Sequence, residues 1–539
     1  MYLIETKLAA AGKKLENFLK SPLFRNSLFF TALFSLLAHA FAYLNLYPQH
    51  DSVNHMFEFA GTWEISLGRF LMPLFGRMQG QVTIPWLIGM LSIPVIAAMV
   101  YMICDLLDLR RPVWVAAVAG VLSANLCITE LASVFTWTVT VYMVAAMLSC
   151  ASVYTVMKGR TLLRYPAAVL LIVGSIGLYQ AEVIFGIVLV AVLAVKDLVS
   201  LEGWSKTVLR YLKLALVFVC AALVYSLLYK LVLHLTGVQP ADSYNSLSNL
   251  KNISASELLV VTKRMYKAFW NFLFGNNCFV GIHVTKTCNI LLAGAAGLLL
   301  LFHFIRTPKN WISHLLTLAV LAVLPGLICV MDIFMAKWKL SFYLLYSLYL
   351  VYALVLWLLV YLGKRYLPKI PGTGTLLITL CFLLITAQNV IYSNQIYSNQ
   401  KIMYDRALSV TTRILDKAES NPEYTIGETE VILVGTLRTN EDLLKTLQID
   451  GKLPNTLQKN QGLRSLMNQA GLNGGKVISI TYNQTFDSFA YLLGSEVNYI
   501  TDADIVKAYE DMEEVQNMPA YPYDGCCRMI DGRMVIKLS

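Results

Sequence analysis

Long apolar stretches alternate with short polar segments along most of the chain up to residue 391. An α-helix needs about 20 mainly apolar residues to cross a bilayer, and about eleven stretches approach this length, several of them short or tilted. They lie near residues 26–46, 84–103, 113–129, 134–156, 167–180, 182–195, 211–234, 289–306, 313–331, 341–363 and 373–391. The pattern predicts a polytopic α-helical membrane protein.

Lysine and arginine residues gather before the first stretch and then in every second connection. The clusters include Lys13, Arg25, Arg110, Arg111, Lys158, Arg160, Lys196, Arg210, Arg306, Lys309, Lys364 and Arg365. Because cytoplasmic loops are enriched in these residues, we expect this side of the membrane to be cytoplasmic. The N-terminus is then inside, and an odd number of spans places the C-terminus outside.

The composition changes after the last apolar stretch to a mixture of polar and apolar residues. Hydrophobic periodicity and turn residues predict a compact fold with both helices and strands. The predicted elements are a helix over 392–418, strands over 431–434, 477–480 and 497–500, a helix over 442–447 capped by Asn440, and a hairpin turning at Asp531-Gly532. We therefore expect a membrane domain over residues 1–391 and a soluble extracytoplasmic α/β domain over residues 392–539.

Composition supports the membrane assignment. Of the 539 residues, 57% are hydrophobic and 14% are charged, whereas a soluble protein carries about 25% charged residues. The net charge of +10 could suggest a nucleic-acid partner, but topology explains the basic residues better because they lie in short loops. The ten cysteines are scattered, most of them inside spans, and no spacing typical of metal ligands occurs.

A hydrophilic loop over residues 47–83 separates the first two predicted spans. It concentrates carboxylates, guanidinium groups and histidine, and a membrane enzyme must keep such polar chemistry at the lipid–water boundary. Its apolar residues recur at helical spacing from Phe57 to Leu74, which predicts one amphipathic helix lying at the interface.

Four short stretches carry a resemblance to a known family. They are Pro48-Gln49-His50-Asp51, Trp63-Glu64-Ile65-Ser66-Leu67-Gly68-Arg69-Phe70, Gly177-Leu178-Tyr179-Gln180-Ala181-Glu182, and Met518-Pro519-Ala520-Tyr521-Pro522 before the last hairpin. In these stretches the chain resembles the GtrII-type glucosyltransferases of bacteria, which belong to the membrane-embedded GT-C class. The resemblance spans most of the chain and implies a GT-C-like fold in a bacterial plasma membrane.

Members of this class transfer a sugar from a polyprenyl phosphate to an extracytoplasmic glycan. The resemblance therefore implies a polyprenyl-phosphate-linked sugar, with glucose expected, a cell-surface glycan acceptor and contact with membrane lipid. It also implies an essential carboxylate in the first outer loop, where the family often has a tandem acidic pair. Asp51 matches this position, but its neighbour is His50 instead of a second acid, which leaves dependence on a divalent metal open.

Transfer from a lipid phosphate needs one base to take the proton of the acceptor hydroxyl, because the leaving phosphate is a weak base and needs no general acid. A glycosidase, in contrast, needs two carboxylates. Asp51 is the candidate base of an inverting transfer, and His50 could share or tune that proton. The alternatives are a solvated residue or helix cap for Asp51, and a structural role for His50.

Three basic residues are candidates for binding the donor phosphate. Arg69 follows Gly68 in the loop, and a guanidinium can hold phosphate through two hydrogen bonds. Arg77 lies near the same face of the predicted helix, and Lys337 lies in a later outer turn. The alternative for Arg69 is an arginine that only sets the depth of the helix, and the alternative for Lys337 is an interfacial anchor.

The candidates for binding the sugar or the acceptor are Glu64, Glu130, Tyr179, Gln180, Glu182 and Trp338. The segment 179–182 interrupts an apolar stretch that is too long for one span, which favours two short spans meeting at the outer surface. A carboxylate at membrane depth is costly unless it lines a polar cavity, as expected for Glu130 and Glu182. The alternative for both is a turn residue exposed to water. Trp338 could pack its ring on a pyranose, or it could anchor the chain at the interface.

The leading interpretation is an inverting glycosyltransferase that uses a lipid-linked sugar. Two alternatives are compatible with the sequence: a transporter or flippase of lipid-linked sugars, and an outer-face polysaccharide polymerase or ligase. Transporters often contain internal repeats and charged or broken helices in mid-membrane. Here the polar groups gather at the outer boundary and the spans show no convincing repeat.

The charge pattern makes a topological prediction. A reporter that is active only outside the cytoplasm should give a signal when it is fused after Ser539, because the basic connections place an odd number of spans before it. The same reporter fused after Arg160 should be silent. Signals in the opposite sense would overturn the assignment of the 47–83 loop as well, because that loop is expected on the same side as the tail.

Overall fold

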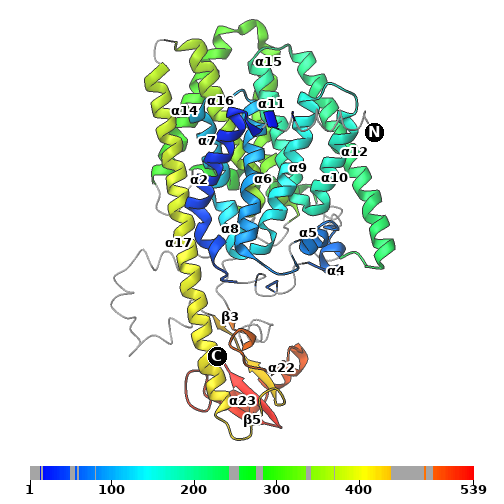
Figure 1. The fold of residues 1–539 in the computed structure, drawn as a ribbon, viewed down its shortest axis with the longest axis vertical. Coiled ribbons are helices and arrows are strands. Elements are labelled where there is room, and N and C mark those ends of the chain that lie inside the picture. Colours follow the sequence, from blue (N-terminus) through cyan, green and yellow to red (C-terminus); the bar gives the residue numbers. More distant parts are fainter. Residues whose placement is uncertain are drawn as a thin grey trace. The chain divides into compact units, whose positions relative to one another are not determined.

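The chain is described here by a computed structural model (Figure 1). The structure describes residues 19–48, 60–78, 80–241, 254–274, 283–334, 342–368, 371–438 and 490–539, with isolated positions at 13, 16–17, 52, 55–56 and 479–480. The chain divides into two compact units. Unit 1 consists of Met1–Asn45, Phe59–Ala132 and Trp137–Asn394, and unit 2 consists of Leu46–Glu58, Ser133–Thr136 and Gln395–Ser539.

Helices make up almost all of the described part of unit 1. The elements up to residue 419 are α2 (Pro22–Leu44), α4 (Thr62–Ser66), α5 (Met72–Met78), α6 (Pro85–Leu106), α7 (Pro112–Ser123), α8 (Leu126–Val134), η1 (Thr136–Thr138), α9 (Val139–Lys158), α10 (Arg164–Leu178), η2 (Gln180–Glu182), α11 (Val183–Val199), α12 (Trp204–Thr236), α13 (Ala255–Phe274), α14 (His283–Arg306), η4 (Pro308–Asn310), α15 (Trp311–Ile328), η5 (Val330–Ile333), η6 (Phe342–Leu348), α16 (Tyr349–Tyr366) and α17 (Pro371–Glu419). Among the described residues, nine helical segments are long and apolar enough to cross a membrane. The chain is therefore a multi-pass membrane protein.

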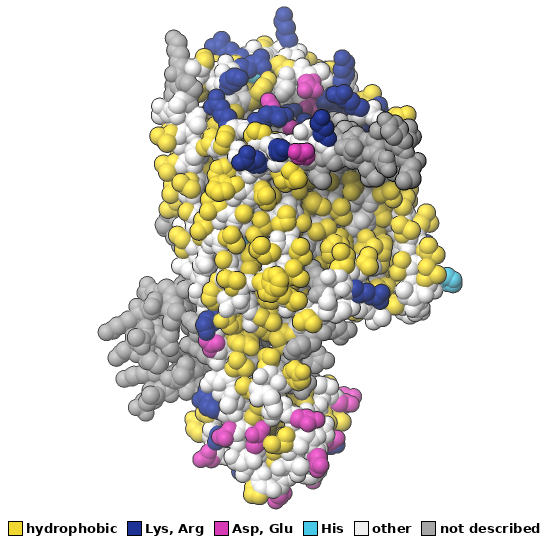
Figure 2. All heavy atoms as spheres, viewed as in Figure 1, with side chains coloured by type: hydrophobic (Ala, Val, Ile, Leu, Met, Phe, Trp, Pro, Cys, Tyr) yellow, Lys and Arg dark blue, Asp and Glu magenta, His cyan; other side chains and the backbone are white. Residues whose placement is uncertain are grey.

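Prolines and polar caps set where several of these helices begin. Pro22, Pro85 and Pro112 occupy the first turns of α2, α6 and α7, where a missing backbone N–H costs nothing. The Ser21 hydroxyl accepts a hydrogen bond from the Phe24 N–H at 3.3 Å and caps α2. Helix α2 packs against α6 and α7, and α9 packs against α6 and α10. Figure 2 shows apolar side chains over the outer faces of these helices, with Lys and Arg gathered at one end.

The loop between α2 and α6 differs from the sequence prediction. Instead of one amphipathic helix, the described residues form two short helices, α4 and α5. Gly68 lies between them with φ +84°, a left-handed backbone conformation that ends a helix. Hydrophobic spacing alone does not report such a break, and this is why the single-helix prediction was wrong.

The expected interruption near residue 180 is present. Helix α10 ends at Leu178, and Tyr179 has an extended backbone conformation with φ −158° and ψ 114°. A single 3-10 turn, η2, follows and leads directly into α11. Helices α10 and α11 contain only 15 and 17 residues. The turn η2 packs against α9, α10 and η6, which brings distant parts of the chain together at this point.

Helix α17 contains the short repeat Ile391-Tyr-Ser-Asn-Gln and Ile396-Tyr-Ser-Asn-Gln. Within unit 1, the Ser393 and Thr129 hydroxyls are 2.7 Å apart, and the Asn394 amide donates to the Leu37 carbonyl at 2.9 Å. Within unit 2, the Gln400 amide donates to the Ser133 carbonyl at 2.8 Å. The polar residues of the repeat are therefore used for helix packing.

Unit 2 contains a four-stranded sheet with the order β4-β1-β6-β5. Its strands are β4 (Asn498–Tyr499), β1 (Glu430–Val434), β6 (Arg533–Lys537) and β5 (Cys527–Ile530). Strand β1 is parallel to β4 and β6, and β5 and β6 form an antiparallel hairpin. The hairpin turns at Asp531-Gly532, where both residues have positive φ. A second pair, β2 (Leu437–Arg438) and β3 (Ser479–Ile480), is antiparallel.

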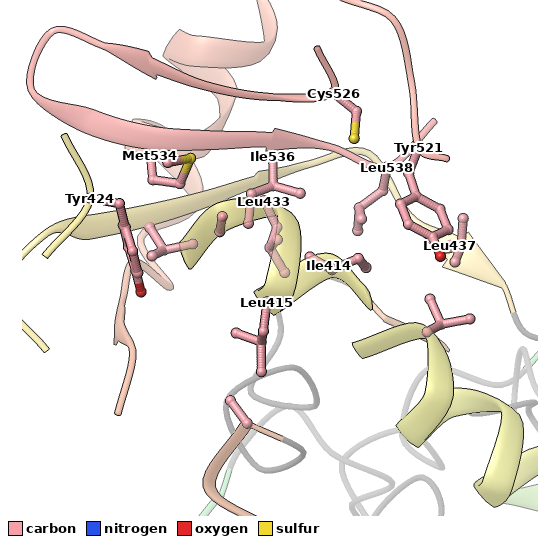
Figure 3. Close-up of a cluster of buried hydrophobic side chains, with 14 residues drawn as sticks. Ile414, Leu415, Tyr424, Leu433, Leu437, Tyr521, Cys526, Met534, Ile536 and Leu538 are labelled. Atoms are coloured by element: carbon pink, nitrogen blue, oxygen red, sulfur yellow. The ribbon is translucent and has the colours of Figure 1, made fainter. Parts of the chain in front are cut away.

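Strand β1 is buried on both faces. Val431 and Leu433 pack with Ile414 and Leu415 of α17 and with β6 in one apolar cluster (Figure 3). The alternate residues of β1 pack on the other face with α22 (Ala503–Glu510) and α23 (Glu513–Asn517). Burial on both faces explains why this strand has a continuous apolar run instead of an alternating pattern. The helix predicted over 442–447 lies outside the described residues.

Candidate active site

Arg69 lies between α4 and α5, immediately after the left-handed Gly68. Its guanidinium carbon is 4.9 Å from the centroid of the Tyr179 ring. Tyr179 in turn stacks on Tyr142 of α9, with ring centroids 3.6 Å apart and planes inclined by 9°. An aromatic face attracts a guanidinium and fixes its plane. The stack therefore holds the side chain of a half-buried arginine in a defined orientation.

Glu182 lies at the end of η2, three residues after Tyr179, and is 3% exposed. No side-chain hydrogen bond or ion pair joins its carboxylate to another described residue. Glu182 lies in the turn outside α10 and α11, and burial raises its pKa from 4.5 to about 8. It interacts electrostatically with the hydroxyls of Tyr142 and Tyr179, as Arg69 does. The buried acid and the stacked arginine thus belong to one site.

Glu130 lies on α8 and is 1% exposed, so it is not a turn residue in contact with water. Its carboxylate accepts a hydrogen bond from the Tyr343 N–H at 2.8 Å. The Cys127 thiol, one turn earlier, donates to the Phe342 carbonyl at 2.8 Å. These contacts hold the start of η6 against α8. Tyr343 interacts electrostatically with Tyr179, which places η6 at the edge of the site.

The other predicted residues have varied positions. Glu64 is 4% exposed, and its carboxylate accepts a hydrogen bond from the Gly61 N–H at 2.7 Å, which caps α4. Arg77 is exposed on α5. The Gln180 amide donates to the Leu67 carbonyl at 2.6 Å. His50, Asp51, Lys337 and Trp338 lie outside the described residues, and they remain predictions from the sequence.

A further buried acid, Asp332, forms an ion pair. Asp332 in η5 is 1% exposed, and its carboxylate accepts a hydrogen bond from Arg264 Nε of α13 at 2.6 Å. This ion pair joins the amphipathic helix α13 to the end of α15. Among the residues that the structure describes, no three His, Cys, Asp or Glu side chains are grouped so that they could hold a metal ion.

The sequence analysis missed four tyrosines of this region: Tyr142, Tyr343, Tyr225 and Tyr229. Each lies on an apolar helix or in its first turn. A tyrosine there gives no signal of function in the sequence, because its ring is compatible with a membrane environment. A signal was available for Tyr225 and Tyr229, because their spacing of four residues places both hydroxyls on one face of α12.

Residues 40–357 match the family described as Glucosyl transferase GtrII. The matched segment is more than half of the chain and contains every described residue of the site. The chain belongs to the GtrII glucosyltransferase family. No match was found among curated proteins or solved structures. The family is that of the resemblance seen in the sequence, and it makes this chain a membrane glucosyltransferase that uses a sugar donor and a glycan acceptor.

The burial of Glu182 predicts a pH-dependent cost to stability. The unfolded side chain ionises above about 4.5 and the folded one only above about 8, so ionisation destabilises the folded enzyme increasingly between these values. Glu182→Gln cannot ionise and should be more thermostable than the wild type at pH 8. The gain should shrink toward pH 5, at a rate of at most about 1.4 kcal/mol per pH unit.

The measurement is the thermal midpoint of each purified protein at pH 5 and pH 8. Glu510→Gln is the matched control, because Glu510 is exposed at the end of α22 and its replacement should produce no such trend. A stability difference for Glu182→Gln that is equal at both pH values would contradict the burial of an unpaired acid.

Proposed function

We propose that this GtrII-family enzyme transfers glucose from a polyprenyl phosphate to an extracytoplasmic cell-surface glycan, with inversion at the anomeric carbon. The observation that carries the proposal is the Arg69–Tyr179–Tyr142 stack beside the buried Glu182. A cation held against aromatic rings, next to a buried acid, is suited to recognise a sugar attached to a phosphate.

Arg69 is the proposed ligand of the donor phosphate. Its guanidinium lies over the face of the Tyr179 ring, and a guanidinium donates its hydrogen bonds in its own plane. The N–H groups can therefore point at two phosphate oxygens while the plane stays fixed. Arg77 is exposed one short helix later, and we propose that Arg77 and Lys337 assist by attracting the phosphate to the site.

Asp51 is the proposed general base. Its carboxylate takes the proton of the acceptor hydroxyl as that oxygen bonds to the anomeric carbon of the donor. The bond from this carbon to the phosphate oxygen breaks, and its electron pair leaves with the polyprenyl phosphate, which needs no proton. Attack opposite the leaving phosphate inverts the anomeric carbon. His50 is proposed to tune the proton affinity of Asp51.

The sugar ring needs both stacking surfaces and hydrogen-bond partners. We propose that Trp338 packs its ring on the pyranose and that Tyr179, which holds Arg69, lies at the side of the sugar. We also propose that Glu182, neutral at pH 7 because burial raises its pKa to about 8, donates a hydrogen bond to a sugar or phosphate oxygen. Glu130 and Glu64 shape the site through the backbone amides that they bind.

The proposed location is a bacterial plasma membrane with the N-terminus in the cytoplasm. Residues 392–539 are proposed to form an extracytoplasmic domain that helps to hold the acceptor. A flippase of lipid-linked sugars would need no base for a hydroxyl group, and membership of a glucosyltransferase family favours an enzyme. A polymerase or ligase would differ only in its acceptor.

Asp51→Asn should lower the rate of transfer about 10²- to 10⁴-fold, because the amide keeps the shape of the side chain but cannot take a proton. The measurement is turnover of a polyprenyl-phosphate-linked glucose by the purified enzyme. Asp108→Asn is the control, because Asp108 is exposed after α6 and has a positive φ that Asn tolerates. Wild-type turnover by Asp51→Asn would rule out Asp51 as the base.

Arg69→Lys should raise the KM for the donor about 10-fold or more and leave the KM for the acceptor nearly unchanged, since lysine keeps the charge but loses the planar fork. Titrating donor and acceptor separately measures both constants. Arg306→Lys is a matched control, because Arg306 also lies over an aromatic ring, Phe302, at the end of α14. An unchanged donor KM in Arg69→Lys would mean that this arginine has only a structural role.

A further inference from the structure

Three consecutive backbone carbonyls immediately before Arg69 each accept a hydrogen bond from a distant side chain. The Tyr229 hydroxyl donates to the Ser66 carbonyl at 2.6 Å. The Gln180 amide donates to the Leu67 carbonyl at 2.6 Å, and the Tyr225 hydroxyl donates to the Gly68 carbonyl at 2.9 Å. The turn 66–68 is thus held by α12 on one side and by η2 on the other.

The fit around Gly68 is close. A Cβ atom at this position would be 2.3 Å from the Tyr225 hydroxyl oxygen and 2.9 Å from Gln180 Nε2. The ring of Tyr225 also stacks with Phe70 at 5.8 Å between centroids, and it stacks with Tyr229 at 6.1 Å. Glycine is therefore required here both for its left-handed backbone and for the close approach of the tyrosine.

The same turn sets the position of Arg69. The Arg69 N–H donates to the Glu64 carbonyl at 2.8 Å, and the Leu71 N–H donates to the Gly177 carbonyl at 3.0 Å. The backbone on both sides of Arg69 is consequently fixed relative to the end of α10, where Tyr179 lies. A change in the turn would shift the guanidinium relative to the ring on which it packs.

Helix α12 is otherwise a peripheral helix. Its 33 residues include only four that are buried, and its leucines at 216, 223, 227, 231 and 235 are exposed. A tyrosine hydroxyl on such an apolar helix needs a hydrogen-bond partner. A backbone carbonyl of the same helix, or a water molecule, would be sufficient. Both hydroxyls instead reach carbonyls of one turn, those of Ser66 and Gly68, which is a more specific arrangement than the solvation of a phenol requires.

We propose that Tyr225 and Tyr229, together with Gln180, are positioning residues that hold the turn 66–68 so that the Arg69 guanidinium packs on Tyr179. The inference rests on the proposed function, because Arg69 is taken to bind the donor phosphate. It assigns to α12 a part in donor recognition, and it explains why the Gln180 amide is directed at the backbone of the turn.

The test compares Tyr225→Phe/Tyr229→Phe with Tyr211→Phe in the full-length enzyme. The double variant keeps both rings and removes only the hydroxyls. Tyr211 is the matched control, because it lies on the same helix about 20 Å away along the axis and its hydroxyl bonds Asp197 at 2.8 Å. The readouts are the KM and kcat for donor and acceptor, and hydrogen exchange of the peptide covering residues 62–72.

The double variant should raise the donor KM roughly 5- to 30-fold, as expected for two lost hydrogen bonds, with little change in the acceptor KM. Exchange in 62–72 should become faster, while Tyr211→Phe should change neither quantity. In an Arg69→Ala background, the double variant should add less than about twofold to the donor KM, because residues that act through one group are not additive. Unchanged exchange, or a full effect in the absence of Arg69, overturns the proposal.

The two assignments fail in different ways. If Arg69→Ala leaves the donor KM unchanged, the phosphate role of Arg69 is wrong, and the exchange data still decide whether the tyrosines hold the turn. If Arg69→Ala impairs donor use but the double variant does not, the phosphate role stands and the positioning role of α12 is wrong.

Discussion

The stacking of Arg69 on Tyr179 is the contact on which the site depends. A guanidinium near a membrane costs free energy unless its charge is stabilised by a neighbouring group. Here the face of the Tyr179 ring stabilises the charge without neutralising it. The surrounding elements hold this cation in a defined position: Tyr179 between α10 and η2 supplies the first ring, α9 the second, and α12 side chains that hold the preceding turn.

A second constraint is the cost of unpaired polar groups in an apolar bundle. Many of the described polar side chains buried in unit 1 form a hydrogen bond within their own helix or to a neighbouring one: the Ser123 hydroxyl donates to the Ala119 carbonyl one turn back, and the His39 ring bonds the Ser123 carbonyl at 2.8 Å. Asp332 has its arginine. Several described hydroxyls, such as those of Thr31 and Ser35, have no hydrogen-bond partner. Glu182 differs from them because it is an ionisable carboxylate, and no described residue pairs with it. A buried ionisable group whose pKa is shifted far from its usual value points to a ligand-binding role.

Local chemistry predicted much of the fold. Apolar length located the helices, and an over-long apolar stretch with Tyr179 and Glu182 in it revealed the break at η2. The two-residue turn at Asp531-Gly532 and the run 431–434 predicted strands that the sheet contains. The loop before α6 was predicted less well, because the spacing of hydrophobic residues does not reveal that Gly68 has a left-handed backbone conformation. The stacked Tyr142 could not be found at all, since no local pattern records that residues 142 and 179 meet. Such a contact follows from how α9 and α10 pack, and helix packing is a property of the whole bundle.

The arrangement also divides charge in a way that suits its proposed ligand. Burial favours the neutral form of Glu182 near pH 7. A neutral acid does not repel a phosphate and can donate a hydrogen bond, whereas an ionised one beside Arg69 would cancel the attraction that brings the donor to the site. The base that takes the acceptor proton must, in contrast, be ionised before the reaction begins. The two tasks require different environments, so a buried acid in η2 and an acid in the hydrophilic loop are suited to different roles. This separation is the physical reason to place the base at Asp51 and the neutral hydrogen-bond donor at Glu182.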